Sequence, residues 1–344
     1  MQQARFYEKV RGSSVRCTLC PHRCLIADGK TGICGVRKNY GGTLMSLVWA
    51  RSVAANVDPI EKKPLFHFLP GSRSFSIATV GCNMRCAFCQ NSDISQYAVE
   101  TGSVTGDVFP PEAVAASAVR AGCRSISYTY TEPTVYLEYA LDTAALAREK
   151  GLYNILVTNG YTSVEVVASA CKHLVDAANI DLKAFTESFY KRLCSARLAP
   201  VLDAIRAYFD AGVWIEITTL VIPGENDSDA ELRDIASFIC SLSPDIPWHV
   251  SRYYPRHLYD KAPPTPVKTL ERAREIGLSQ GLHFVYTGNV AGHEGEHTVC
   301  PGCRNVVIAR RGFTVESMNL SGSACAACGR TIPGKFTEPR VIPH

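Results

Sequence analysis

The chain has 344 residues, of which 46% are hydrophobic and 20% are charged, and its formal net charge is +4. This composition excludes a disordered chain and is that of a globular protein with a large core. The small net charge gives no indication of nucleic-acid binding. No apolar stretch reaches the ~18 uninterrupted residues that a membrane helix needs, and the N-terminal segment lacks the apolar core of an export signal. We therefore expect a cytoplasmic protein that does not span a membrane.

Short β-branched runs alternate with segments of helical periodicity from residue 75 to residue 286. Strands are predicted at 75–80, 125–130, 153–157, 178–182, 214–222, 248–253 and 284–286. Helices are predicted at 111–121, 136–150, 164–174, 201–211, 230–242 and 268–280. Regular alternation of this kind predicts a parallel sheet that right-handed crossovers curl into a barrel. The predicted fold is α/β, a parallel partial (β/α)6-type TIM barrel with an active site where the strands end.

The fifteen cysteines are clustered in a way that indicates metal binding. Random placement predicts roughly 0.65 C-x2-C pairs in a chain of this composition, whereas four are present. An odd number of cysteines in a chain without an export signal argues against a disulfide scaffold. Eleven cysteines fall into three groups, and the other four are predicted to be small buried hydrophobic residues. These four are Cys123, Cys171, Cys194 and Cys240.

The two ends of the chain each carry four cysteines in a glycine-rich and turn-rich setting. We expect three parts, namely an N-terminal cysteine-rich module and lead-in (1–70), the barrel (71–290) and a C-terminal module (291–344). The C-terminal spacing is that of a zinc ribbon, with paired strands predicted near 306–308 and 313–315. For the N-terminal group, zinc and a second iron–sulfur cluster both remain open, with a slight preference for zinc. The N-terminal ligands are Cys17, Cys20, Cys24 and Cys34, and the C-terminal ligands are Cys300, Cys303, Cys325 and Cys328.

The central group, Cys82, Cys86 and Cys89, has the spacing C-x3-C-x2-C and follows the first predicted barrel strand. Four thiolates close the coordination of a 4Fe-4S cluster, whereas three leave one iron free to bind another molecule. A structural zinc site with an unrecognised fourth ligand is the alternative. His249, in a later strand, could line the cofactor or substrate side, although a lone strand histidine is more often structural.

With Phe88 before its third cysteine, this segment resembles the radical S-adenosylmethionine (SAM) superfamily, whose signature is C-x3-C-x-aromatic-C. The resemblance implies that Cys82, Cys86 and Cys89 hold a 4Fe-4S cluster whose open iron binds SAM beside Phe88. One electron from a low-potential donor would then cleave SAM into methionine and a 5'-deoxyadenosyl radical. That radical would take a hydrogen atom from a C–H bond of the substrate.

The same resemblance implies further SAM contacts at the strand ends. Thr131 and Glu132 stand where the superfamily often has Gly-Gly-Glu-Pro, and they would bind the methionine ammonium. Asn159 or Asp181 would contact the ribose and Lys183 the carboxylate, as in glycyl-radical-enzyme activases. An ordinary ion pair between Asp181 and Lys183 is the alternative for these two residues.

Five motifs, in order along nearly the whole chain, resemble one subgroup of this superfamily. They lie at 17–21, 32–37, 58–65, 128–134 and 293–296, and the cysteine triad and the final four-cysteine ribbon take their places in the same order. The subgroup is that of the AmmeMemoRadiSam-system radical enzymes, which are relatives of pyruvate formate-lyase activating enzyme. The resemblance implies Memo-like and AMMECR-domain proteins as candidate partners, and it supplies no substrate.

Two enzyme functions and one non-enzymatic function follow as hypotheses. The leading hypothesis is a radical enzyme that modifies a C–H position of an unidentified substrate, either a small molecule or a protein. The alternative is an activase that generates a glycyl radical on a partner protein. The non-enzymatic hypothesis is a scaffold or binding protein that is stabilised by its metal sites and holds iron without cleaving SAM.

Overall fold

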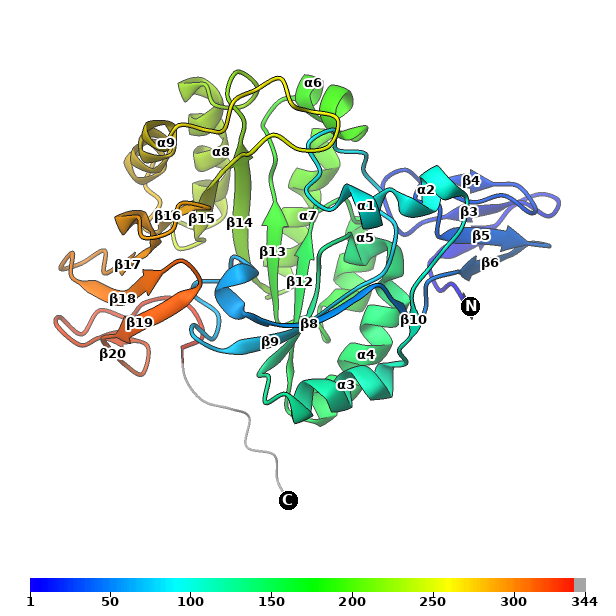
Figure 1. Cartoon of the computed structure of the whole chain (residues 1–344), viewed down its shortest axis with the longest axis horizontal. Helices are drawn as coiled ribbons and strands as arrows, with labels where there is room; N and C mark the ends of the chain where they lie inside the picture. The colour runs from blue at the N-terminus through cyan, green and yellow to red at the C-terminus, as the bar shows by residue number, and fades with distance from the viewer. Residues whose placement is uncertain (337–344) are drawn as a thin grey trace.

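The computed structural model describes residues 1–336, and its centre is one eight-stranded sheet (Figure 1). Its strands are β8 (Ala54–Pro59), β9 (Arg73–Ala78), β11 (Ser125–Tyr128), β12 (Tyr153–Thr158), β13 (Ala177–Asp181), β14 (Trp214–Val221), β15 (Trp248–Arg252) and β16 (Val285–Gly288). The spatial order is β16-β15-β14-β13-β12-β11-β9-β8, and every neighbouring pair is parallel except β8 with β9. The two edge strands do not pair with each other, so the sheet is a partial barrel.

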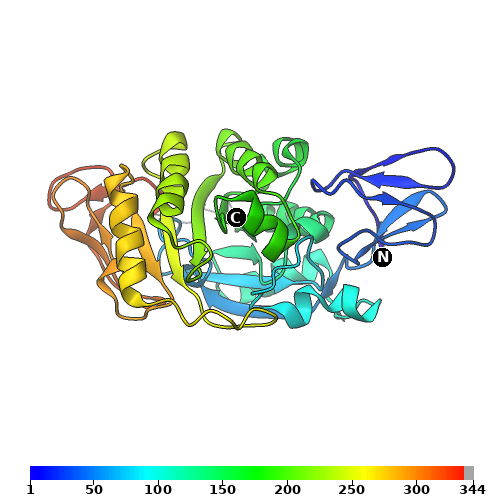
Figure 2. The same ribbon diagram turned by 90° about the horizontal axis from the view of Figure 1, so that it is seen from above.

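Helices cover the outer face of this sheet, and each crossover from one parallel strand to the next contains helical structure (Figures 1 and 2). The helices are α3 (Pro111–Arg120), α4 (Leu137–Glu149), α5 (Val164–Val166), α7 (Leu198–Asp210), α8 (Asp229–Leu242) and α9 (Val267–Ser279). The predicted α/β partial barrel is therefore confirmed. It has seven parallel strands, which is one more than a (β/α)6 unit.

Two local predictions differ from the structure. The helix predicted at 164–174 is α5 followed by a π-helical turn, η3 (Val167–Cys171). Strand β8 was not predicted, because its outer face is exposed and its sequence, Ala-Ala-Asn-Val-Asp-Pro, has polar residues and a proline that are rare in strands. It pairs antiparallel with β9 at the edge of the sheet, which is where a proline is tolerated.

The segment 60–69 closes one end of the barrel. Ile60, Leu65, Phe68 and Leu69 are buried against the first residues of β12, β13 and β14. This segment thereby covers the amino ends of β12, β13 and β14. The carboxyl ends are left to build the site.

Small β-modules lie at opposite ends of the barrel (Figures 1 and 2). The N-terminal module contains β1 (Gln2–Gln3), β2 (Tyr7–Lys9), β3 (Val15–Cys17), β4 (Leu25–Ile26), β5 (Arg37–Tyr40) and β6 (Thr43–Ser46). The C-terminal module contains β17 (Thr298–Val299), β18 (Val306–Arg311), β19 (Thr314–Met318), β20 (Leu320–Ser321) and β21 (Ala324–Cys325). Strands β18 and β19 pair antiparallel, as the sequence predicted. Within residues 1–336, no helix is long and apolar enough to cross a membrane.

Candidate active site

The three central cysteines lie on the loop between β9 and the short helix α1 (Ser92–Ser95), at the carboxyl edge of the sheet. All three cysteine residues are partly exposed. The backbone N–H of Met84 donates to Cys82 Sγ at 3.3 Å, and the Ser95 hydroxyl lies 3.3 Å from Cys89 Sγ. Polar groups of the loop thus surround the sulfurs in a way that suits thiolate ligands.

This donor set fits a 4Fe-4S cluster held by three protein ligands. Three cysteines on one loop can bind three irons and leave the fourth for an exchangeable ligand. Burial raises the pKa of Cys82 well above the usual range and also raises that of Cys89, so both sulfurs need a bound cation to ionise. The cationic irons of the cluster would supply that stabilisation.

Cys194 contacts this loop, which the sequence analysis did not predict. It is buried, as predicted, at the end of the π-helical turn η4 (Tyr190–Cys194). Its thiol lies close enough to Cys86 to lower the pKa of that cysteine. The Cys194 carbonyl also accepts a hydrogen bond of 2.9 Å from the backbone N–H of Arg85. No sequence signal marks this contact, because more than a hundred residues separate the two cysteines.

Glu132 is a buried carboxylate at the start of the loop after β11. Its Oε1 accepts hydrogen bonds from the Thr134 backbone N–H at 2.9 Å, the Thr134 hydroxyl at 2.6 Å and the Thr158 hydroxyl at 2.7 Å. Its Oε2 accepts from the backbone N–H of Asn159 at 2.8 Å. Burial nevertheless raises its pKa. Glu132 therefore ties the carboxyl end of β11 to that of β12, and its predicted contact with an ammonium group stays a prediction.

Asn159 links the end of β12 to the cysteine loop. Its Nδ2 donates to Asn83 Oδ1 at 2.9 Å and lies 3.6 Å from Cys82 Sγ. Asn83 Nδ2 in turn donates to the carbonyl of Tyr161 at 2.7 Å. The structure thus brings Asn159 to the triad, and its predicted ribose contact stays a prediction.

Asp181 and Lys183 form an ion pair of 2.7 Å at the end of β13. Burial lowers the pKa of Lys183, but the charges of Asp181, Cys86 and Cys194 outweigh that effect and raise it well above the usual range. The predicted alternative, a strand-end ion pair, is therefore present. The pair is close enough to Cys86 to influence its charge, so it belongs to the same site.

Phe88, Thr131 and His249 are the remaining predicted contacts. Phe88 is buried, with its ring centroid 5.7 Å from that of Phe189. The Thr131 hydroxyl donates to the carbonyl of Thr79 at 2.8 Å, beside the cysteine loop. His249 does not join them, because its Nε2 is hydrogen-bonded to the buried Glu216 at 2.7 Å. The structure gives His249 the buried structural setting that the sequence analysis left as its alternative.

A second polar cluster, not predicted, lies beside Thr131. The Tyr130 hydroxyl donates to Asp58, which also accepts from the buried ammonium of Lys63 at 2.6 Å and from Lys62 at 2.9 Å. Lys63 Nζ also lies 4.5 Å from the centroid of the Tyr130 ring. Asn91 Nδ2 donates to the Tyr130 carbonyl at 2.8 Å, which connects the cluster to the cysteine loop. Tyr130 adopts a left-handed φ of 64°, and such strain is typical of functional sites.

The C-terminal cysteines have the geometry of a single-ion site. The sulfur atoms of Cys300 and Cys328 are 3.6 Å apart, and those of Cys303 and Cys325 are 3.7 Å apart. All four sulfurs lie within 4.8 Å of one another. Zinc–sulfur bonds of about 2.3 Å in a tetrahedron require this kind of separation. The donor set therefore fits zinc.

Comparisons with known proteins identify relatives of the barrel. Residues 76–236 match the radical SAM superfamily. An uncharacterized protein of Methanocaldococcus jannaschii is 42% identical over 96% of this chain and 99% of its own length. The pyruvate formate-lyase-activating enzyme of Streptococcus mutans is 25% identical over 57% of this chain and 81% of its own length. Among solved structures, a radical SAM methyltransferase from Sphaerobacter thermophilus is 16% identical, with a TM-score of 0.50 over 67% of this chain and 71% of that one.

Proposed function

The chain belongs to the radical SAM superfamily, and from this premise we propose that it is an enzyme that cleaves SAM reductively to abstract hydrogen from a C–H bond. That it is an enzyme follows from the superfamily itself and from its enzymatic relatives. The observation that carries the proposed reaction is the loop after β9, with three partly exposed cysteines at the open edge of the barrel. Its substrate would be a small molecule or a protein.

The bound cofactors would supply the chemistry, because a reduced 4Fe-4S cluster transfers one electron to SAM, which then yields methionine and a 5'-deoxyadenosyl radical. Cys82, Cys86 and Cys89 would hold that cluster. The residues of this chain would otherwise bind and orient the cofactor and exclude water. The segment 60–69 supports the last role, since it covers the amino ends of β12, β13 and β14.

Glu132 is proposed to act as a positioning residue. Its four hydrogen bonds hold Thr134, Thr158 and Asn159 in fixed places around the triad. Asn159 would then donate to Cys82 and help to stabilise the thiolate. Lys183 offers an ammonium for the SAM carboxylate, and Asp181 keeps that ammonium charged and oriented.

Activation of a partner protein is a second candidate function. The 25% identity to a pyruvate formate-lyase-activating enzyme favours it, because the match spans most of that enzyme. In this case the abstracted hydrogen would come from a glycine of the partner. A glycine-centred radical signal in the partner's EPR spectrum would identify this function, and a small-molecule enzyme would not produce it.

We further propose that the chain is a member of the AmmeMemoRadiSam-system subgroup. The order of its five sequence motifs, from 17–21 to 293–296, supports this assignment. Memo-like and AMMECR-domain proteins are then the first partners to test by co-purification. A low-potential one-electron donor would also be needed.

The decisive experiment measures 5'-deoxyadenosine from anaerobically reconstituted protein with SAM and a low-potential reductant. We expect the product from the native chain and from Cys240→Ala, and none from Cys86→Ala. Cys240 is a suitable control because it is a partly exposed cysteine on α8. If the native and Cys86→Ala proteins both contained iron and neither produced 5'-deoxyadenosine, the result would contradict the proposal and favour the scaffold hypothesis.

A further inference from the structure

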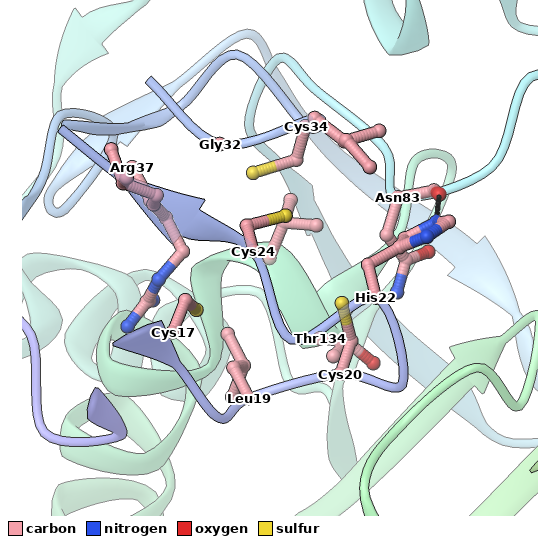
Figure 3. Close-up of a pocket in the computed structure, with 13 residues that line it drawn as sticks. Cys17, Leu19, Cys20, His22, Cys24, Gly32, Cys34, Arg37, Asn83 and Thr134 are labelled. Carbon is pink, nitrogen blue, oxygen red and sulfur yellow. Dashed lines mark hydrogen bonds between the residues drawn. The ribbon is translucent and has the colours of Figure 1, made fainter. Parts of the chain in front are cut away.

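A pocket in the N-terminal module is lined by all four cysteines of that region. Cys17 ends β3, Cys20 and Cys24 lie in the loop to β4, and Cys34 lies in the turn before β5. Figure 3 shows the four sulfur atoms directed toward one shared space. Four ligands from three separate chain segments therefore face one volume.

The sulfurs in this pocket are too far apart for one ion. Among residues 1–336, the C-terminal cysteines are the one group of three or more metal-ligating side chains whose ligand atoms all lie within 4.8 Å. No three of the four N-terminal sulfurs meet that limit. A tetrahedral ion holds every pair of its thiolates at close range, whereas a four-iron cluster binds each thiolate through a different iron and so needs them farther apart. The two four-cysteine groups therefore differ in how closely their sulfurs lie.

The pocket also supplies hydrogen-bond donors to an anionic guest. Backbone N–H groups of His22, Ile33 and Val36 lie near the sulfurs of Cys20, Cys24 and Cys34, respectively. Hydrogen bonds to cysteine sulfur are a normal feature of iron–sulfur sites.

Arg37 provides a further donor at the wall of this pocket. Its side chain is 1% exposed, and its Nε is a buried donor with no hydrogen-bond partner in residues 1–336. Its two Nη atoms are already used, because they donate to both carboxylate oxygens of Glu138 at 2.8 Å. A buried donor without a partner is costly, and a cluster with its anionic sulfides could accept from it.

The pocket shares a wall with the central triad. His22 Nε2 lies 2.8 Å from the carbonyl oxygen of Asn83, the residue after Cys82, and Asn83 itself lines the pocket. Arg85, in the triad loop, donates to the carbonyl of Ile33 at 3.0 Å. A Cβ added to Gly81 would lie 2.6 Å from Val36 Cγ1 and 3.2 Å from the Cys34 carbonyl oxygen. The two cysteine groups are therefore packed directly against each other.

From the sulfur spacing, the donors and the shared wall, we propose that Cys17, Cys20, Cys24 and Cys34 bind a second 4Fe-4S cluster. This cluster has four protein ligands, so its irons are coordinatively closed and it would not bind SAM. The assignment replaces the slight preference for zinc that the sequence spacing left. It rests on the N-terminal module and its contacts with the triad loop, and it does not depend on the reaction at the central triad.

The test uses full-length protein in which the triad is removed by Cys82→Ala, Cys86→Ala and Cys89→Ala together. The N-terminal module stays native in this variant, so its folding is not at risk from substitutions of its own ligands. After anaerobic reconstitution with ferrous iron, sulfide and zinc, we expect about four irons and four acid-labile sulfides per chain. We also expect the Mössbauer spectrum of a cubane and about one zinc.

A second variant locates that iron. Adding Cys20→Ala and Cys24→Ala to the triad variant should remove the remaining iron and sulfide while about one zinc stays bound. A triad-free protein with about two zincs and no sulfide would overturn the proposal, as would a single iron without sulfide. Either result would leave the SAM cleavage assay of the native chain unaffected, so failure of this proposal is distinguishable from failure of the proposed function.

Discussion

The two terminal modules have the same four ligands but differ in how the fold arranges them. In the C-terminal module, two C-x2-C pairs face each other across a β-ribbon, and paired sulfurs lie 3.6 and 3.7 Å apart. In the N-terminal module, the sulfurs line an open pocket against the barrel. We infer from this comparison that the number of cysteines predicts a metal site, whereas the backbone that holds them would select the metal.

The two modules are alike in one respect, because a buried arginine of each module bonds to residues of the barrel side. Arg37 forms a two-bonded ion pair with Glu138 of α4. Arg310 donates to the carbonyl of Phe66 at 2.7 Å and to the Thr298 hydroxyl at 2.8 Å, and its Nε lies 3.7 Å from Glu61. The contact of the N-terminal module with the barrel is thus ionic, whereas Arg310 reaches the barrel side through one neutral carbonyl, that of Phe66, and one carboxylate, that of Glu61.

The largest expected effect is the loss of the C-terminal ion in Cys325→Ser. We expect one zinc fewer per chain and a loss of about 5 kcal/mol or more in the local stability of the ribbon, because bound zinc provides much of the folding energy of so small a unit. Hydrogen exchange of peptides from 298–325 would measure it, with peptides from β3 to β5 as the internal control. Unchanged protection in zinc-free protein would contradict the structural role of the ion.

Arg37→Met should destabilise the N-terminal module by about 3–5 kcal/mol, because it leaves Glu138 charged and unpaired in a buried place. Peptides from β5 and β6 should exchange faster, and the iron content should fall. The double variant Arg37→Met/Glu138→Met is the matched control, since it removes both charges. If the single variant were as stable as the double variant, the Arg37–Glu138 ion pair would not be what holds the N-terminal module to the barrel.

Arg310→Met should have a smaller effect, about 2–3 kcal/mol, because most of its acceptors are neutral. Its measurement is hydrogen exchange of β18 and β19 together with the zinc content, which we expect to stay at one per chain. Arg311→Met is the matched control, since the neighbouring side chain is exposed. An equal loss of stability in the two variants would contradict the role that we assign to Arg310 in holding the C-terminal module to the barrel.

The smallest expected effect is that of His22→Phe in the N-terminal module, and His67→Phe, at the contact with the C-terminal part of the chain, is the comparison. His22→Phe removes one half-buried hydrogen bond to Asn83, at a cost of about 1 kcal/mol. His67→Phe removes two bonds, to the Pro333 carbonyl at 2.7 Å and to the Tyr286 hydroxyl at 2.6 Å, and should cost about 2–3 kcal/mol. Thermal unfolding of both variants would give the ranking. A larger loss of stability in His22→Phe than in His67→Phe would show that the contact between the N-terminal module and the triad loop depends on this one hydrogen bond.

Most of the barrel was predictable because its strands and helices carry strong local periodicity. The predicted strand at 214–222 and the predicted helix at 230–242 each match the structure within a residue. The failures have local causes. Strand β8 lacks a β-branched run, and the segment after Val166 continues as a π-helical turn, which periodicity at 3.6 residues does not distinguish from an α-helix.

The candidate site was only partly predictable. Cys82, Cys86 and Cys89 share one loop, so their spacing alone marks them. Cys194 and the cluster of Asp58, Lys63 and Tyr130 reach the site from distant segments and carry no spacing signal. For His249, the sequence could not tell a site residue from a buried partner of Glu216.

The amino-acid sequence by itself determined the alternating α/β order and the three groups of cysteine ligands, because periodicity and ligand spacing are local properties of a chain. Only the tertiary structure decided how far apart the thiols of each group lie and which group adjoins the triad. Those distances depend on how β3, the turn at Cys34 and the loop at Gly81 pack together. Ligand separation is the property that distinguishes a single ion from a four-iron cluster, so the fold decides what the same four residues bind.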